Sequence, residues 1–291
     1  MPKKDAFLAN HPAVLVWQGG RVQIESIAIY PVKGCHRVEV GEAVVEPWGL
    51  AADRRWLVVD ARTGVAVTLR DTARLTQIFP APLGDGLVLR MAGRSDLTVP
   101  APIDAPLVDV TVWSFTGPAM LAGQEADEWL CTGLERDVRL VWMDDPTRRA
   151  VKPAYSRASD RVNFADGFPV SLANSASLTA LNDLILEADP TQAPVPVTRF
   201  RSNIVMAGAP AWVEDEWTGG RIRIGDVDFR VAKPSDRCVV TTIDAETGEK
   251  GREPLRTLGR HRNVDQELLF ATLLIPDTFG TIAVGDPVTV L

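Results

Sequence analysis

The sequence predicts a β-rich α+β fold in two parts, and three observations predict it. Glycine (22 residues) and proline (21 residues) interrupt the 291-residue chain often, so its apolar runs are short. These runs are rich in the β-branched residues that favour strands. Only two segments have helical spacing, so the chain lacks the regular alternation of strands and helices that a parallel α/β sheet requires. With 46% hydrophobic residues, the chain can bury a sizeable core.

The predicted strands are bounded by turn dipeptides. In the first half we expect strands at residues 22–30, 38–46, 55–60, 65–70 and 86–90. Thr63-Gly64 and Asp85-Gly86 lie between such runs, where they supply the positive φ of a tight hairpin turn. Near the C-terminus, residues 222–232 and 282–291 each have the pattern of a strand, a Gly-Asp turn and a second strand. The cysteine at 238 is expected to lead directly into a strand.

Two segments have the period of an amphipathic helix. The first covers residues 120–134, and Gly133 is expected to break its end. The second covers residues 175–188, where Asn174 or Ser175 can cap the start and three prolines follow the end. A polar stretch with proline at residues 142–150 then predicts the boundary between a first part, 22–142, and a second part, 143–291.

Composition and absent motifs exclude several classes of function. The 31 basic and 38 acidic residues give a net charge of −7, which argues against a nucleic-acid-binding protein. Three cysteines without a CxxC pair, and only three histidines, argue against a disulfide scaffold and an ordinary zinc site. No apolar run reaches the ~20 residues of a membrane helix, and residues 1–17 lack a signal-peptide pattern. We therefore expect a cytoplasmic protein. The loops typical of nucleotide binding, serine hydrolysis and zinc proteases are absent.

Cationic residues are clustered despite the acidic composition. One cluster is Arg148, Arg149, Lys152, Arg157 and Arg161. Such a cluster either binds an anionic ligand such as a phosphate or forms a solvated face paired with the surplus carboxylates. A second group comprises Arg199, Arg201, Arg221, Arg223 and Arg230, followed by Lys233 and Arg237 beside Cys238.

The three cysteines have different settings. A lone cysteine is commonly a small buried residue, but Lys233 and Arg237 would favour a thiolate at Cys238, which suits a soft metal. Cys35 lies beside Lys33 in a weaker version of the same setting, and the alternative for it is a packed residue. Cys131 lies inside the first predicted helix, where we expect it in the core.

Several segments together resemble one known family. These are IAIYPVKGC (27–35), DRRWLVVD (53–60), FRSNIV (200–205), PSDRCVVTTID (234–244) and GTIAVGDPV (280–288). In this order they resemble MOSC-domain proteins with an N-terminal β-barrel partner, a family that includes the mitochondrial amidoxime-reducing component and its bacterial counterparts. The resemblance covers roughly residues 22–291. It implies an N-terminal β domain followed by a MOSC β-barrel with peripheral helices.

The resemblance also implies a molybdenum cofactor, with the thiolate of Cys238 as the protein ligand to molybdenum. The residues implied to bind the cofactor are Lys33, Gly34, Arg54, Gly167, Phe168, Arg201, Asn203, Asp236 and Arg237. Lysine and arginine side chains suit the phosphate of the cofactor, and Asn203 with backbone groups suits its pterin ring. Gly34 and Ser202 differ from the family's usual serine and proline. Residues 270–274 also depart from the family pattern and are expected to border the substrate.

The implied function is an oxidoreductase that reduces N-hydroxylated or N-oxygenated small molecules by oxygen-atom transfer. The chain has no iron–sulfur motif, so a separate electron donor is implied: a ferredoxin- or cytochrome b5-like protein, or a flavoprotein reductase. No nucleic acid and no membrane partner is expected. The alternative is a non-catalytic carrier or binding protein for molybdenum cofactor or sulfur.

Overall fold

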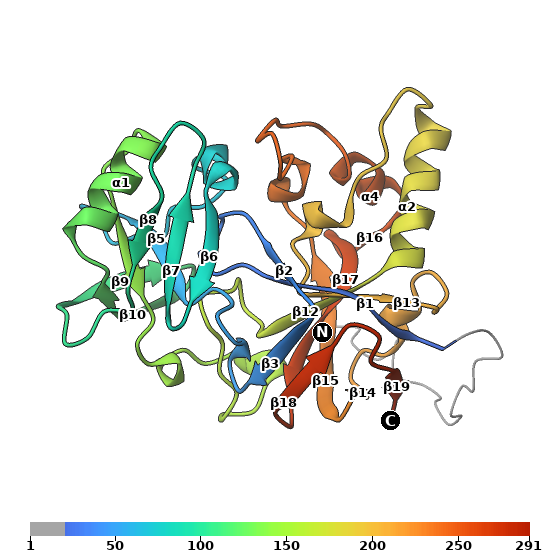
Figure 1. Cartoon of the computed structure of the whole chain (residues 1–291). Helices are drawn as coiled ribbons and strands as arrows, with labels where there is room; N and C mark the ends of the chain where they lie inside the picture. The colour runs from blue at the N-terminus through green and yellow to red at the C-terminus, as the bar shows by residue number, and fades with distance from the viewer. Residues whose placement is uncertain (1–20) are drawn as a thin grey trace, which may run out of the picture.

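The structure is a computed structural model that describes residues 21–291. It has the predicted β-rich α+β architecture, with two halves side by side (Figure 1). No helix within residues 21–291 combines the length and apolar character needed to cross a membrane. The predicted lack of a signal peptide concerns residues 1–17, which lie outside the described part of the chain.

The largest sheet has nine strands and carries most of the second half. In order across the sheet they are β19 (Val288–Val290), β14 (Arg221–Ile224), β15 (Val227–Asp236), β17 (Glu267–Pro276), β12 (Val170–Asn174), β13 (Ile204–Ala207), β1 (Gln23–Ile29) and β2 (Val38–Val40), with β16 (Asn263–Val264) paired to β17. All neighbours are antiparallel except β12 and β13. Two N-terminal strands are thus hydrogen-bonded into a sheet of C-terminal strands. The division of the chain at residues 142 and 143 stays a prediction.

Three smaller sheets complete the fold. One contains β5 (Trp56–Asp60), β11 (Val138–Trp142), β10 (Phe115–Leu121) and β9 (Leu107–Val112). The second contains β18 (Gly280–Ala283), β3 (Glu42–Glu46) and β4 (Gly49–Leu50), and the third contains β6 (Phe79–Leu83), β7 (Gly86–Arg90) and β8 (Leu97–Val99). Since β18 pairs with β3, the C-terminal segment also holds the N-terminal one in place.

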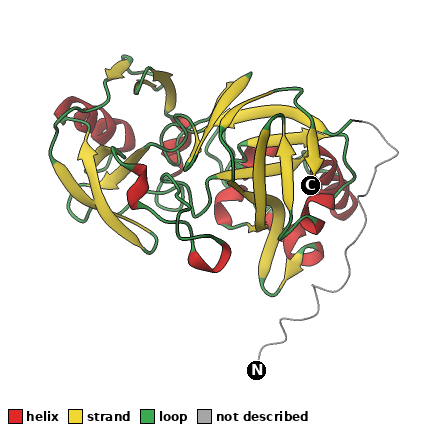
Figure 2. Ribbon diagram, turned by 90° about the horizontal axis from the view of Figure 1, so that it is seen from below, coloured by secondary structure: helices red, strands yellow, loops and turns green. Residues whose placement is uncertain are grey.

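Within residues 21–291, four α-helices cover these sheets: α1 (Gln124–Leu134), α2 (Ser175–Ala188), α3 (Val213–Glu216) and α4 (Leu255–His261). Seen from below, the longer helices lie on the outer sides of the two halves (Figure 2). The short 3-10 helices are η1 (Ala73–Gln77), η2 (Pro146–Arg148), η3 (Pro153–Tyr155), η4 (Val197–Phe200) and η5 (Val239–Thr242). The prediction for α2 is confirmed, and Asn174 caps it by accepting a hydrogen bond from the backbone N–H of Ala176 (3.0 Å).

The first helix was predicted to start too early and to end for the wrong reason. Met120 and Leu121 pair with neighbouring strands as the end of β10, so strand pairing outweighs their helical spacing. The helix begins after Gly123, whose φ is +116°. Gly133 lies inside the helix, and the chain leaves the helical conformation at Glu135, whose φ is +53°.

Four further predictions need correction. Residues 38–46 form two strands, because β2 pairs with β1 while β3 pairs with β18. Residues 65–70 make only isolated bridges, such as Val65 to Thr111. The turn before β7 takes its positive φ from Gly84 (+57°) and not from Gly86. After Cys238 the chain forms η5 and not a strand, because Cys238 and Val239 accept local bonds from the hydroxyls of Thr241 and Thr242.

Candidate functional site

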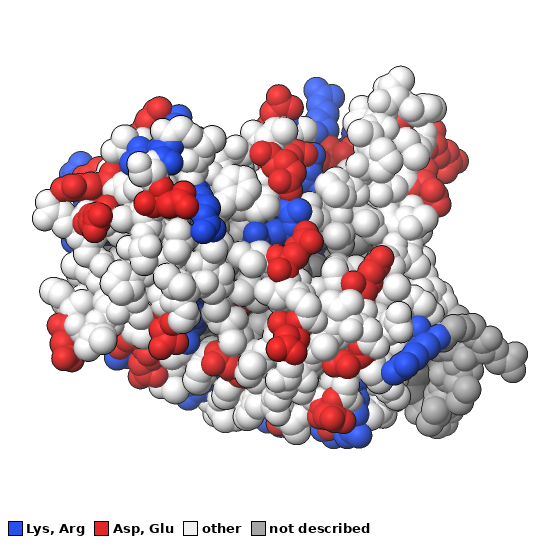
Figure 3. Space-filling model, viewed as in Figure 1, with Lys and Arg blue, Asp and Glu red and all other residues white. Residues whose placement is uncertain are grey.

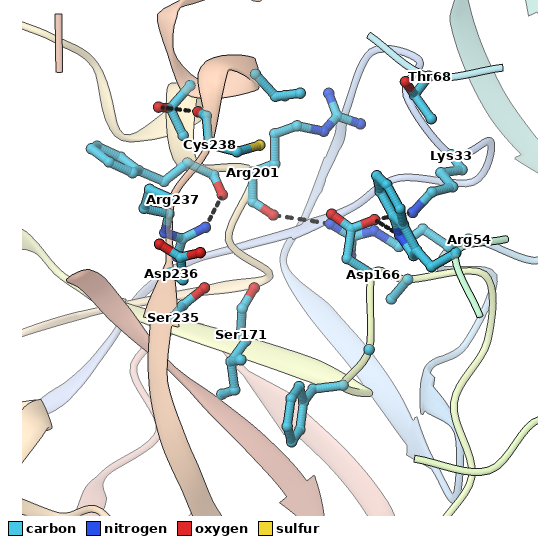
Figure 4. A pocket seen from close by; sticks show the side chains of 18 of the residues that line it. Lys33, Arg54, Thr68, Asp166, Ser171, Arg201, Ser235, Asp236, Arg237 and Cys238 are labelled. Carbon is cyan, nitrogen blue, oxygen red and sulfur yellow. Dashed lines mark hydrogen bonds and ion pairs between the residues drawn. The ribbon is translucent and has the colours of Figure 1, made fainter. Parts of the chain in front are cut away.

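One pocket of about 320 Å³ opens where loops from both halves meet. Its walls come from the loop after β1, the loops before β5 and β12, the end of η4 and the end of β15. All ten residues predicted from the sequence line it: Lys33, Gly34, Arg54, Gly167, Phe168, Arg201, Asn203, Asp236, Arg237 and Cys238. Figure 4 gives a close view of this pocket. The structure therefore brings the whole predicted set together, while the role of each residue stays a prediction.

A pair of arginines is fixed around one buried tyrosine. The guanidinium carbons of Arg54 and Arg201 lie 4.4 and 4.3 Å from the centroid of the Tyr30 ring, which favours cation–π attraction. Arg54 donates to Asp53 (2.6 Å) and to the backbone carbonyl of Arg201 (3.0 Å). Arg201 donates to the carbonyl of Cys35 (2.8 Å). Burial lowers the pKa of Arg201, but an arginine remains charged at neutral pH.

Asn203 ties this arginine pair to the large sheet. Its side-chain oxygen accepts from Arg54 (3.1 Å) and from Ser171 (3.3 Å), and its amide nitrogen donates to the carbonyl of Ala28 (3.2 Å). These partners come from β1, β12 and the loop before β5. Asn203 thus lines the pocket and also positions Arg54.

Lys33 is a further buried cation of the pocket, near Arg54 and Asp166 (Figure 4). Its ammonium group forms an ion pair with Asp166, which also accepts from the indole N–H of Trp113 (3.0 Å). Burial lowers the pKa of Lys33, and Asp166 offsets part of that shift. Desolvation by the pocket walls acts to raise the pKa of Asp166, but Lys33 outweighs it and holds this pKa below its usual range. The adjacent Gly34 has a φ of +86°, a backbone conformation that glycine adopts readily.

Arg237 and Cys238 stand at the end of β15. The Arg237 side chain donates through Nε to the carbonyl of Phe270 (2.8 Å) and through Nη1 to that of Phe200 (3.0 Å). Its Nη2 is buried and finds no hydrogen-bond acceptor within residues 21–291. Burial lowers the pKa of Arg237 to about 10. A buried donor without an acceptor is costly, so this atom fits an acceptor supplied by a ligand in the pocket.

The residues of the pocket fit an anionic cofactor that carries its own metal ligands. Across the described chain, no group of three or more His, Cys, Asp or Glu side chains could hold a metal ion. A metal in this pocket would therefore need ligands from a cofactor besides the half-buried thiol of Cys238. Four cations and the unpartnered Nη2 of Arg237 would suit the phosphate and the acceptor atoms of such a group.

The other two cysteines stand apart from the pocket wall. Cys35 is fully buried, and burial raises the pKa of its thiol to about 12, so it remains a protonated packed residue. Cys131 lies in α1, as predicted, but it is only half-buried and packs against the core of the first half instead of lying within it. Its sulfur both donates to and accepts from the backbone of Val138 (3.3 Å each).

The cationic cluster at residues 148–161 is largely paired within the protein. Arg148 pairs with Asp144 (2.6 Å), and Arg157 pairs with Asp277 (2.9 Å). Arg149 is buried and donates to backbone carbonyls in the loop that carries Asp166. Lys152 alone of the cluster lines the pocket.

Sequence reasoning missed several lining residues. They are Thr68, Arg70, Trp113, Tyr155, Asp166, Ser171 and Ser235, among others. Asp166 had an available signal, since it directly precedes the predicted pair Gly167 and Phe168. No sequence signal indicated Trp113, because it lies in the turn between β9 and β10, far in sequence from the other lining residues. In the segment 270–274, only Leu273 reaches the pocket.

Comparisons with known proteins match both parts of the chain. Residues 21–137 match the MOSC N-terminal beta barrel domain, and residues 159–289 match the MOSC domain. Mitochondrial amidoxime-reducing component 1 of Mus musculus is 33% identical over 288 residues, which cover 92% of this chain and 82% of that protein. The Homo sapiens protein of that name is 32% identical with the same coverage. Mitochondrial amidoxime reducing component 2 of Homo sapiens is 30% identical and covers 91% and 82%.

Proposed function

The chain belongs to the MOSC-domain family that includes the mitochondrial amidoxime-reducing components, and from that premise we propose that it is a molybdenum-cofactor enzyme that reduces N-hydroxylated compounds. One observation gives the proposal its main support. The thiol of Cys238 lines the same pocket as four enclosed cations and the unpartnered Nη2 of Arg237. A soft metal ligand and an anion site thus share one cavity.

Each group of residues has a distinct task in this proposal. Cys238 would be the protein ligand to molybdenum. Lys33, Arg54, Arg201 and Arg237 would bind the anionic part of the cofactor. Gly167 would offer backbone groups at the pterin, and open space surrounds the place where its Cβ would stand. Phe168, Asn203 and Asp236 would complete the wall.

When bound, the cofactor supplies two-electron chemistry that converts an N–OH group and two protons to N–H and water. The chain contributes orientation and electrostatics. Arg54 and Arg201 are already held by Tyr30 and by backbone carbonyls, so they need little reorganisation when an anion binds. The half-buried setting of Cys238 limits competition from water.

The electrons would come from a separate protein, ferredoxin- or cytochrome b5-like, or a flavoprotein reductase. We also propose a cytoplasmic location, although the relatives carry the word mitochondrial in their names.

The test is the molybdenum content of protein made in a cofactor-producing host. The wild type should contain near-stoichiometric metal and reduce an N-hydroxylated compound with reduced viologen as donor. Cys238→Ala should lose both, whereas the matched control Cys131→Ala, on α1, should keep its metal.

Two results would contradict the proposal. Metal without turnover of any N-hydroxylated compound would favour a carrier of cofactor or sulfur. Full activity in Cys238→Ala would exclude Cys238 as the essential ligand.

A further inference from the structure

The pocket has more positive charge than the proposed cofactor site uses. Eight cationic side chains line it against two aspartates: Lys33, Arg54, Arg70, Lys152, Arg199, Arg201, Lys233 and Arg237 against Asp166 and Asp236. In Figure 3, lysine and arginine side chains are visible in the hollow between the two halves, with acidic side chains beside them. Four of these cations are the proposed cofactor ligands.

Two of the remaining four are neutralised by carboxylates. Lys233 pairs with Glu267 (2.9 Å), and Arg199 pairs with Asp244 (2.9 Å). Arg70 and Lys152 are exposed, and neither has a salt-bridge partner within residues 21–291. They are therefore the two cations of these four that no carboxylate of the described chain neutralises.

Two half-exposed aromatic rings line the same pocket, and one of them lies against Arg70. The guanidinium carbon of Arg70 lies 4.7 Å from the ring centroid of Trp113, whose exposed fraction is 49%. Lys152 immediately precedes η3, which carries Tyr155 with an exposed fraction of 41%. The ring of Tyr155 also packs edge-on against Phe168 (6.0 Å between centroids). Exposed aromatic faces beside free cations suit a flat ring that bears a negative charge.

We propose that the pocket selects planar aromatic N-oxygenated compounds that carry an anionic group, with Arg70 and Lys152 as the residues that bind this group. The inference rests on the proposed function and adds the class of substrate. Trp113 and Tyr155 would contact the ring, and the N–O group would face the wall that holds Cys238. A cationic compound would be disfavoured, because the lining has eight cations against two aspartates.

The kinetic test compares matched substrates, with reduced viologen as the electron donor. They are benzamidoxime, its 4-carboxy and 4-phosphono derivatives, and a 4-trimethylammonio derivative. We expect kcat/KM to be about tenfold higher for the anionic compounds than for the neutral one, and lowest for the cation, because two exposed charges contribute modestly. The preference should decline as salt is added. The kcat/KM values of the carboxy and phosphono derivatives show which anionic group the pocket binds better.

A double variant assigns the effect to the two residues. Arg70→Ala with Lys152→Ala should bring the ratio of anionic to neutral kcat/KM close to one. The matched control, Arg62→Ala with Lys250→Ala, removes the same charge from exposed sites outside the pocket lining and should keep the ratio. A preference that persists in the double variant would overturn the proposal, as would loss of molybdenum from that variant, which would assign both cations to the cofactor.

A binding measurement separates this proposal from the proposed function. Calorimetric titration with 4-carboxybenzamide and benzamide needs no turnover, and the acid should bind more tightly only while Arg70 and Lys152 are present. If that preference holds while no oxime is reduced, the reductase proposal fails and the anionic selectivity stands. If benzamidoxime is reduced as fast as its acidic derivatives, the function stands and the selectivity fails.

Discussion

Replacing Asn203 by alanine should destabilise the protein strongly, because this side chain links three separate segments. It accepts from Arg54 (3.1 Å) and from Ser171 (3.3 Å) and donates to Ala28 (3.2 Å), and only 2% of it is exposed. A hydrogen bond to a charged group contributes about 2 kcal/mol and a neutral one about 1 kcal/mol. Asn203→Ala should therefore cost about 4 kcal/mol, or about 10 °C in Tm.

The assay is thermal unfolding of cofactor-free protein, combined with molybdenum content after expression in a cofactor-producing host. Asn203→Ala should also lower the metal content, since Arg54 loses one of the bonds that hold it in the pocket. The matched control is Asn182→Ala on α2, which loses two bonds to Val195 (2.8 and 3.0 Å) away from the pocket. It should lower Tm and keep the metal. A fall in Tm below about 3 °C for Asn203→Ala would refute the hydrogen-bond reasoning.

Three further predictions test other parts of the structure. Burial raises the pKa of Glu214, so the carboxyl group keeps its proton to higher pH in the folded state than in the unfolded chain. Stability should therefore fall as pH rises from about 4.3 through the folded pKa. Glu214→Gln should make the Tm from thermal melts less dependent on pH in this range. Cys35, with a pKa of about 12, should resist iodoacetamide at about pH 8, whereas Cys238 of cofactor-free protein should react. Peptide mass spectrometry would detect which cysteine is modified. Modification of Cys35 first would contradict its burial. Gly64→Ala should cost roughly 2 kcal/mol in chemical denaturation, because φ is +68° and the Cβ would lie 2.4 Å from a backbone oxygen; Gly84→Ala, with open space around its Cβ, should cost less.

The sequence predicted which residues line the pocket better than how these residues are arranged. Local motifs identified Lys33, Arg54, Arg201 and Arg237 because each lies in a short segment that resembles a known family. Asp166 was missed, although it is the residue that pairs with Lys33 across 133 positions of sequence. Such a pairing depends on the tertiary fold, and no local pattern encodes it.

The fold has the same division between local and non-local information. The limits of α2 were predicted correctly because its cap, its apolar face and the prolines after it are all local. Residues 120 and 121 were assigned to a helix because only their pairing with β9 and β11 makes them a strand. The insertion of β1 and β2 into the C-terminal sheet was equally invisible, since it depends on the pairing of β1 with β13.

The way in which Arg201 and Arg237 are bound helps to explain how an acidic protein keeps a cationic pocket. Outside the pocket, arginines such as Arg148 and Arg223 pair with carboxylates, which cancel their charge. Inside it, Arg201 and Arg237 donate to backbone carbonyls, which orient a guanidinium without neutralising it. An anion that enters therefore meets oriented charges and displaces no carboxylate from them. Four other cations of the lining differ, because carboxylates hold them: Lys33 pairs with Asp166, Arg54 with Asp53, Arg199 with Asp244 and Lys233 with Glu267. An anion that binds at one of these side chains must share the cation with its carboxylate.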